Sequence, residues 1–326
     1  MNHRQRMQDC ISGSEVDRPP VALWRHFPVD DQDPKQLSEA IIQFQNTYDF
    51  DFIKITPASS FCVRDNGVMD AWRGNPEGTR EFTYYPIQNP KDWARLKRLS
   101  PQEGNLKSQL ECIKLVKSGT KDTPVIQTIF EPMSQAKNLV GKENLLVHMR
   151  QHPKELHTGL QRITENTISF IEACKAIGID GVFYAIQYAQ ASLMSKTELD
   201  EFVIPYAREI LNHTKELWLN LIHIHGKDIY FDAISDLPTS IINWHDRETF
   251  PSLRQAQDLC SAAVCGGLKQ WDMLVYGSAD QVSLEAREAI QQTNGKRFIL
   301  GTGCVLPIIA PHGNISAVRR AVEEVV

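Results

Sequence analysis

Two histidines separated by one residue stand in the stretch LIHIHGKDIY, at positions 223 and 225. Successive side chains of a β-strand point to opposite faces, so in an extended chain His223 and His225 share one face. Neutral imidazoles that converge from one face can bind a single zinc ion at about 2.0–2.1 Å. Cys304, in the stretch GTGCVLP, adds a thiol to the candidate ligands. We therefore expect His223, His225 and Cys304 to bind Zn²⁺ and to leave one coordination position open to substrate or water.

Other interpretations of these residues stay open. Histidines near the end of a strand can simply be hydrogen-bonded beside a polar cavity, and a lone cysteine in a glycine-rich turn is usually a small buried side chain. His245 and Cys265 end two further apolar runs, and each is expected to pack or to support the ligands rather than to bind the metal. Asp246 could orient an imidazole by accepting its second N–H.

Polar side chains after other apolar runs are candidates for catalysis and substrate binding. Glu131 follows the run PVIQTIF and is predicted to be a general base or a metal ligand, with a charge at a helix start as the alternative. Arg25 lies at the end of the first run and can bind a carboxylate through two parallel N–H bonds, with a salt bridge to a loop acid as the alternative. We expect Arg25 to act in catalysis and, together with His26, Gln187 and Tyr188, in substrate binding.

A scaffold that brings the ends of distant segments together is needed to position these side chains. Apolar, β-branched runs alternate with longer segments of helical periodicity, which indicates parallel strands covered on both faces. The expected strands are 21–27, 50–55, 124–130, 180–186, 220–226, 240–246, 261–267 and 297–303. Eight such strands predict a closed (β/α)8 barrel, whose sites form at the carboxyl ends of the strands. A doubly wound open sheet is the alternative, and the lack of GxGxxG after the first strand disfavours it.

The main helices are expected at 34–48, 106–119, 155–178 and 195–217, with Gly178 at the C-terminal end of the third. The segment between the second and third strands, about seventy residues long, gives the least clear pattern. We find no linker or internal repeat and predict a single domain over residues 1–326.

Composition narrows the classes of partner. The net charge of −5 disfavours a nucleic-acid partner, which would need a strongly basic surface. We find neither an apolar signal-peptide core near the start nor an apolar run long enough to cross a bilayer, so no membrane association is expected. The seven cysteines form no CxxC pair, which is typical of reduced thiols in a cytoplasmic protein.

Three segments resemble the uroporphyrinogen decarboxylase superfamily, which also contains zinc methyltransferases that work with methylcobalamin. They are the stretch DRPPVALWRHFP (17–28), the stretch that begins GIDGVFYAIQ (178–210), and the segment from WDMLVYG through the turn GTGCVLP (271–324). The resemblance covers most of the chain and implies a (β/α)8 barrel, in agreement with the strand pattern.

The resemblance also implies site residues, and it lies nearer the methyltransferase branch. The metal motif of that branch is His-x-Cys plus a later cysteine, which corresponds here to His223, His225 and Cys304, with histidine in place of the first cysteine. Arg25 matches the first of the decarboxylase arginines. Thr56 stands where the decarboxylase places its pyrrole-binding aspartate, which disfavours porphyrinogen decarboxylation, because the pyrrole N–H groups would be buried unpaired.

The sequence thus predicts a zinc-dependent methyltransferase or demethylase that moves a methyl group between a small substrate and a corrinoid protein. One alternative is a decarboxylase acting on a porphyrinogen or a smaller aromatic acid seated by Arg25. Another is a non-catalytic barrel that binds a tetrapyrrole or corrinoid. The resemblance also implies a homodimer.

Overall fold

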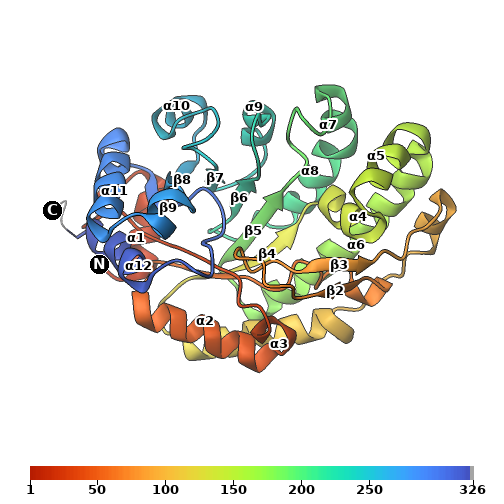
Figure 1. The fold of residues 1–326 in the computed structure, drawn as a ribbon, viewed down its shortest axis with the longest axis horizontal. Helices are drawn as coiled ribbons and strands as arrows, with labels where there is room; N and C mark the ends of the chain where they lie inside the picture. Colours follow the sequence, from red (N-terminus) through yellow and green to blue (C-terminus); the bar gives the residue numbers. More distant parts are fainter. Residues whose placement is uncertain (324–326) are drawn as a thin grey trace.

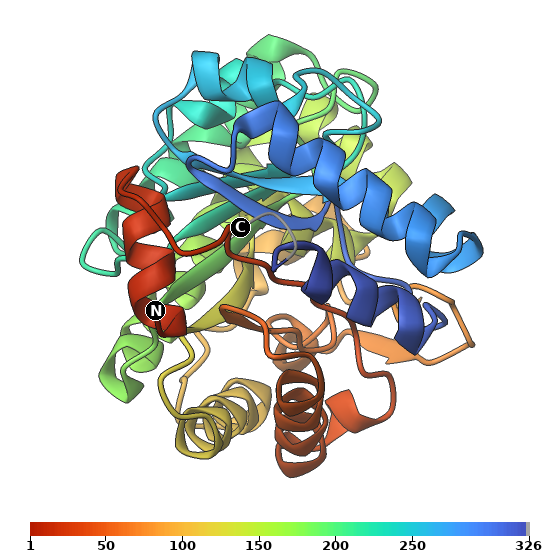
Figure 2. The same ribbon diagram turned by 90° about the vertical axis from the view of Figure 1, so that its left-hand side faces the viewer.

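Parallel strands curled into one sheet form the centre of the protein, and the helices surround them (Figures 1 and 2). The computed structural model describes residues 1–323, and within these residues the sheet has seven strands in the order β1-β4-β5-β6-β7-β8-β9. They are β1 (Ile53–Ile55), β4 (Val125–Phe130), β5 (Gly181–Ile186), β6 (Leu221–Ile224), β7 (Ile241–Trp244), β8 (Ala263–Leu268) and β9 (Phe298–Thr302). The predicted α/β class and parallel pairing are confirmed. The predicted domain extends into residues 324–326, which lie outside the described part of the chain.

The helices begin and end close to the local signals in the sequence. They are α1 (His3–Ser12), α2 (Pro34–Tyr48), α3 (Gly104–Gly119), α4 (Pro132–Val140), α5 (Lys142–Gln151), α6 (Pro153–Ile177), α7 (Lys196–Phe202), α8 (Ile204–Asn212), α9 (Phe231–Ser235), α10 (Leu253–Leu259), α11 (Ala279–Thr293) and α12 (His312–Ala321). Gly178 ends α6 in the left-handed conformation, as predicted. The helix expected over 195–217 is divided into α7 and α8, because Pro205 lacks the N–H that a continuous helix would need there. Among the helices described, none has both the length and the apolar character needed to cross a membrane.

The first predicted strand, 21–27, does not form a regular strand, so the structure confirms the sheet but not the full (β/α)8 barrel. Val21 makes an isolated parallel bridge with Leu300 of β9. Its carbonyl accepts the N–H of Asp51 just before β1, and its own N–H donates to the Asp51 side chain. Because Pro20 has no N–H and that of Val21 is bound to a side chain, the segment cannot continue a strand ladder. It links β9 to the start of β1 by only a few hydrogen bonds.

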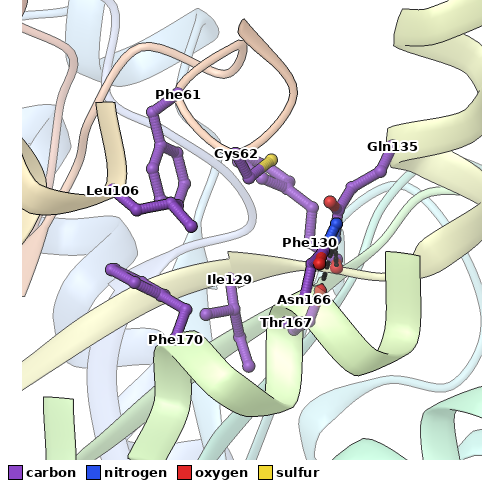
Figure 3. Close-up of a pocket in the computed structure, with 9 residues that line it drawn as sticks. All are labelled: Phe61, Cys62, Leu106, Ile129, Phe130, Gln135, Asn166, Thr167 and Phe170. Carbon is purple, nitrogen blue, oxygen red and sulfur yellow. Dashed lines mark hydrogen bonds between the residues drawn. The ribbon is translucent and has the colours of Figure 1, made fainter. Parts of the chain in front are cut away.

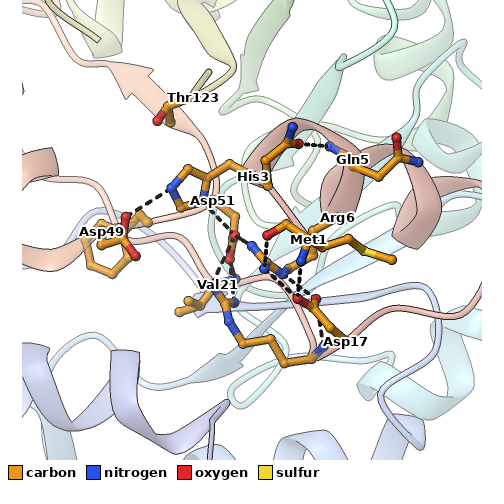
Figure 4. A network of polar contacts seen from close by, with 12 residues as sticks. Met1, His3, Gln5, Arg6, Asp17, Val21, Asp49, Asp51 and Thr123 are labelled. Atoms are coloured by element: carbon orange, nitrogen blue, oxygen red, sulfur yellow. Dashed lines mark hydrogen bonds and ion pairs between the residues drawn. The ribbon is translucent and has the colours of Figure 1, made fainter. Parts of the chain in front are cut away.

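A buried carboxylate secures this link. Asp51 is fully buried and accepts hydrogen bonds from Arg6 Nη1 (2.7 Å), Arg18 Nη1 (2.8 Å) and Val21 N (2.8 Å), while His3 Nδ1 lies 3.0 Å away (Figure 4). Burial alone would raise the pKa of Asp51, but the contacts with His3, Arg18 and Val21 outweigh it and lower the pKa to about 2. The ionised carboxylate therefore ties α1 and the segment before Val21 to the start of β1.

A hairpin lies in the long middle segment, whose sequence pattern is the least clear of the chain. It pairs β2 (Met69–Ala71) with β3 (Glu81–Tyr84) in antiparallel fashion. The stretch 90–99, which has helical character in sequence, forms only a 3₁₀ helix over Pro90–Arg95. Residues of the hairpin and its turn line a cavity of about 330 Å³, so this segment contributes to the site described below.

Asp51→Asn should lower the free energy of unfolding by about 3 kcal/mol or more, because it leaves buried cationic partners without their anion. Asp258→Asn is the matched control, since Asp258 is an exposed partner of Arg254 at 3.2 Å and should contribute about 1 kcal/mol or less. Urea denaturation of the three proteins measures both effects.

The wild type and Asp51→Asn also test how the stability contributed by this carboxylate depends on pH. The pKa of Asp51 is lowered on folding, so its contribution is complete above the unfolded value of about 3.9 and is lost as pH falls towards about 2. The stability difference between the wild type and Asp51→Asn should thus be constant near neutral pH and shrink below pH about 4. A difference that stays constant throughout the acid range would contradict this role.

Candidate metal centre

His223 lies in strand β6, and His225 directly follows the end of that strand, so the two imidazoles lie close together. The ring centroids of His223 and His225 lie 5.9 Å apart, and His223 stacks on Phe183 of β5 at 5.5 Å. Gly226 follows with a φ of +97°, and a Cβ there would lie 1.9 Å from Gln190 Oε1. Only glycine fits this turn, which ends the strand directly after His225.

The loop after β9 brings the predicted thiol to these imidazoles. Cys304 Sγ lies 3.7 Å from His223 Nε2 and 3.6 Å from His225 Nδ1. A close approach at Gly303 makes this possible, because a Cβ there would lie 2.8 Å from His245 Cα. The two histidines predicted as zinc ligands therefore meet Cys304, which lies about 80 positions further along the chain.

A fourth donor joins them. The side chains of His223, His225, His245 and Cys304 each offer a ligand atom, and these atoms lie within 4.8 Å of one another. In a tetrahedral zinc site with ordinary bond lengths, a sulfur and a nitrogen ligand are separated by about 3.6 Å. The two sulfur–nitrogen distances agree with that value, so the residues present fit a zinc ion. The sequence predicts that His245 packs or supports the ligands, and its buried Nε2 has no hydrogen-bond partner among the described residues.

Asn243 of β7 fixes the orientation of His223. Its amide nitrogen donates to the carbonyls of Cys265 and Thr302, both at 2.9 Å, so its oxygen must face His223 Nδ1, 2.7 Å away. An oxygen can only accept, so His223 carries its proton on Nδ1 and presents the lone pair of Nε2 to the cluster. Such hydrogen bonds commonly hold the histidine ligands of metals in place.

The ionisation of the cluster suits metal binding. Burial lowers the pKa of His223 and His245, and it lowers that of His225 to about 4, helped by the positive charge of neighbouring groups. The imidazoles are therefore neutral at pH 7 and able to bind a cation. Burial also raises the pKa of Cys304 to about 12, so this side chain is a thiol until a cation displaces its proton.

Asp246 and Cys265, which are also expected to support the ligands, make other contacts in the structure. His245 Nδ1 is 3.1 Å from Glu248 Oε2, so Glu248 and not Asp246 orients this ring. The Asp246 carboxylate instead accepts the N–H of Gly267. Cys265 is buried in β8, next to Asn243 in the sheet register, and does not belong to the four-donor cluster.

A cavity of about 330 Å³ lies beside the cluster, large enough for a small organic molecule. Its walls combine aromatic rings with polar and charged groups. It is lined by Trp24, His26, Lys54, Thr56, Ser59, Glu77, Thr79, Arg80, Phe82, Thr128, Phe130, Lys137, Asn138, Phe183, Ala185, Gln187, His223, His225, Cys304 and Val305. The predicted substrate-binding residues His26 and Gln187 belong to this lining, and His245 does not.

Three predicted site residues do not line this cavity. Glu131 is fully buried, and its Oε1 accepts the N–H groups of Gln187 and Tyr188 at 2.6 and 2.7 Å. It thereby holds the loop after β5, and burial raises its pKa to about 7. Arg25 contacts the carbonyls of His26 and Ile308, and its guanidinium lies 5.3 Å from the centroid of Phe27. Tyr188 is buried. The catalytic roles of Glu131 and Arg25, and the substrate-binding roles of Arg25 and Tyr188, stay predictions.

Sequence reasoning missed several residues of the cavity. Lys54 lies inside the apolar run FDFIKI and lines the cavity. A charged side chain within a buried strand must face a polar space, so the position of this lysine in the run could have marked it as a site residue. Glu77 and Arg80 come from the hairpin segment, where no spacing marks them.

A second hollow lies between α6 and the segment around Phe61 (Figure 3). Its volume is about 10 Å³, and apolar side chains such as Leu106, Ile129 and Phe170 line most of it. A space of that size is at the lower limit for a single water molecule, so it is a packing gap rather than a substrate site.

Comparison with known proteins finds a matching family model and several relatives. A model of the family described as uroporphyrinogen decarboxylase (URO-D) matches residues 2–325. A methylated-thiol–coenzyme M methyltransferase from Methanosarcina mazei is 27% identical over 206 residues, which cover 62% of this chain and 53% of that relative. The methylcobamide:CoM methyltransferase MtbA from Methanosarcina acetivorans is 23% identical over 236 residues, 70% of this chain and 67% of the relative.

A uroporphyrinogen decarboxylase from Rhodococcus opacus is 27% identical over 152 residues, 45% of this chain and 42% of that enzyme. The chain thus spans about half the length of the Methanosarcina mazei relative and of the Rhodococcus opacus relative. Among solved structures, a methyltransferase from Methanosarcina mazei superposes with a TM-score of 0.87 at 18% identity, covering 100% of this chain and 99% of the other. This likeness shows a shared fold.

Asn243→Ala should lower zinc affinity about 10- to 100-fold, because the ring of His223 loses the partner that orients it. Asn314→Ala is the matched control, since Asn314 is also buried and donates to the carbonyls of Met273, Leu274 and Gly277, away from the cluster. Competition with a chromogenic chelator measures both affinities. Equal losses in the two variants would show that Asn243 acts on stability alone.

Zinc loading at pH 7 should release about one proton per chain, because only Cys304 must lose a proton before it can bind. Weakly buffered titration with a pH indicator measures the release. Cys304→Ser should abolish it, and unchanged proton release in that variant would contradict the protonation assigned to the cluster.

Proposed function

We propose that this chain, which belongs to the uroporphyrinogen decarboxylase (URO-D) family, transfers a methyl group between a small substrate and a corrinoid carried by a partner protein. His223, His225 and Cys304 would bind a zinc ion at the wall of the cavity. The observation that carries the proposal is the convergence of two imidazoles and a thiol at distances that fit tetrahedral zinc, with one imidazole oriented by Asn243.

A zinc ion at this place would supply Lewis acidity, which lowers the pKa of a thiol or polarises the oxygen of a methyl ether. The chain's own contribution is to position the substrate and to exclude water. His223, His225 and Cys304 line the cavity, whereas His245 is not part of the lining. A substrate in the cavity would therefore approach from the side of the three predicted ligands. The aromatic rings of Phe82, Phe130 and Phe183 form an apolar wall on which a methyl-bearing group can pack.

The names of the relatives support this choice of reaction. One acts on methylated thiols and another on methylcobamide, both as methyltransferases. For transfer to a thiol, the sulfur–carbon bond forms as the cobalt–carbon bond breaks, the electron pair stays on cobalt, and the thiol proton passes to solvent. The corrinoid partner, the methyltransferase activity and the zinc ion are proposals for this chain on that basis.

Charge at the cavity wall disfavours porphyrinogen decarboxylation, the reaction of other relatives. The pyrrole N–H groups of such a substrate need an acceptor. The sequence resemblance implies that Thr56 takes the position of the decarboxylase aspartate, and the Thr56 hydroxyl accepts a hydrogen bond from Lys54 Nζ at 3.0 Å. A buried donor is thus present where an anion would be required. A homodimer and a non-catalytic binding role stay predictions from sequence.

The test uses protein purified without a histidine tag, reconstituted with zinc, and incubated with methylcobalamin and 2-mercaptoethanol without oxygen. We expect about one zinc per chain and zinc-dependent loss of methylcobalamin absorbance, with the methylated thiol identified by mass spectrometry. In the reverse direction, reduced cobalamin would be offered a panel of small methyl ethers and thioethers. A wild-type chain that retains no zinc after reconstitution would remove the basis of the proposal.

Variants at position 225 separate a ligand from a structural residue. His225→Ala should reduce zinc affinity more than about 100-fold, since the loss of a ligand exceeds that of an outer partner. His225→Cys should restore binding, because a thiolate is also a zinc ligand and is the residue expected there from the resemblance. His213→Ala is the control, as His213 is an exposed residue after α8. Equal affinity in His225→Ala and the wild type would exclude His225 from the metal site.

A further inference from the structure

Lys54 places an amino group without an acidic partner in the wall of the cavity. Its side chain is 7% exposed, and its Nζ donates one hydrogen bond, to Thr56 Oγ1. Among residues 1–323, no carboxylate oxygen lies within ion-pair distance of this nitrogen. An ammonium group in such surroundings has lost most of its hydration without gaining an anion.

Aromatic rings compensate for only part of this loss. Lys54 Nζ lies 4.3 Å from the ring centroid of Phe183 and 6.0 Å from that of Trp24, distances at which a cation is attracted to the ring faces. Burial nevertheless lowers the pKa of Lys54 to about 7. The ammonium form is thus incompletely stabilised by the protein alone.

The other charges of the cavity do not supply the missing anion. Arg80 is already paired with Asp70 at 2.8 Å and Asp31 at 3.5 Å. Glu77 accepts a hydrogen bond from Trp271 and makes no ion pair with Lys54. Lys137 is a second amino group in the lining, and its Nζ donates to the neutral amide of Gln187 at 2.9 Å. Within residues 1–323, neither Lys54 nor Lys137 makes an ion pair, and the one carboxylate of the lining is that of Glu77.

We propose that Lys54 binds an oxyanion of the substrate, so that the protein acts on small organic acids with a largely apolar body. The inference rests on the proposed function only for which group of the substrate reacts. The binding of an anion at Lys54 does not depend on it. A carboxylate at Lys54 would complete the ion pair that the protein lacks, and the body of the acid would lie along Trp24 and Phe183.

The position of Lys54 relative to the metal ligands fits a small molecule. Phe183 is a shared neighbour of both, since its ring centroid is 4.3 Å from Lys54 Nζ and 5.5 Å from the ring centroid of His223. The amino group and the imidazole are thus separated by no more than these two distances together. An acid of about the size of a substituted benzoate can contact Lys54 at one end and present a heteroatom to the cluster at the other.

The test compares benzoate with benzamide, which have nearly the same shape and differ in charge. Calorimetric titration of the zinc-loaded and zinc-free wild-type chain should show benzoate binding at least about 10-fold more tightly than benzamide, a difference that an added ion pair at a desolvated site can supply. Lys54→Met should abolish the preference, and Lys54→Arg should retain it. Lys107→Met, at an exposed position of α3, is the control and should behave as the wild type.

Each outcome decides the inference. Equal binding of the two probes by the wild-type chain, or binding of neither, would overturn it, and this result does not depend on the variants folding. A preference retained by Lys54→Met would also overturn it. Because the zinc-free chain is measured too, charge selectivity can persist even if zinc binding or methyl transfer fails, so the two proposals are tested separately.

Discussion

The hydrogen bond between Asn243 and His223 decides how the cluster is arranged. Two backbone carbonyls hold the Asn243 amide group, so its oxygen can only face the imidazole. That contact fixes the proton of His223 on Nδ1 and turns the lone pair of Nε2 towards Cys304. A rotated ring would present an N–H to the thiol and could not bind a cation. The geometry of the candidate metal centre therefore begins inside the sheet, one strand away from the ligand.

The curled parallel sheet explains how residues so distant in sequence can meet. Strands β6, β7 and β9 supply His223, Asn243 and the loop with Cys304, and their carboxyl ends lie at the same edge of the sheet. Gly303 allows the last of these segments to approach β7 closely. Near the amino-terminal start of β1, Asp51 secures the short segment that links β9 to β1. The carboxyl ends of the strands thus carry the candidate site, whereas the contacts near the amino-terminal end of β1 stabilise the fold.

The sequence predicted those features that follow from strand periodicity and from strand ends. His223 and His225 share a face because side chains alternate, and Cys304 follows the last strand, so their meeting was predictable. The place of His245 in the cluster was not predicted, because a single histidine after a strand has no spacing that marks it as a neighbour of the other two. Glu131 was placed correctly after its strand, but its contacts with the turn at Gln187 depend on a loop conformation that no local pattern encodes. The failure of segment 21–27 to form a strand arises from Asp51, a partner outside that segment.

The presence of one sulfur among four donors has a consequence for oxidative damage. A cluster with two thiols can close a disulfide when it loses its ion, whereas a single sulfur has no second thiol in the cluster to react with. Cys304 also remains protonated in the metal-free chain, and a thiol is attacked by peroxide far more slowly than a thiolate. If zinc binds here as proposed, the metal-free cluster would therefore resist oxidation, and a chain that had lost its zinc in air would be able to bind zinc again.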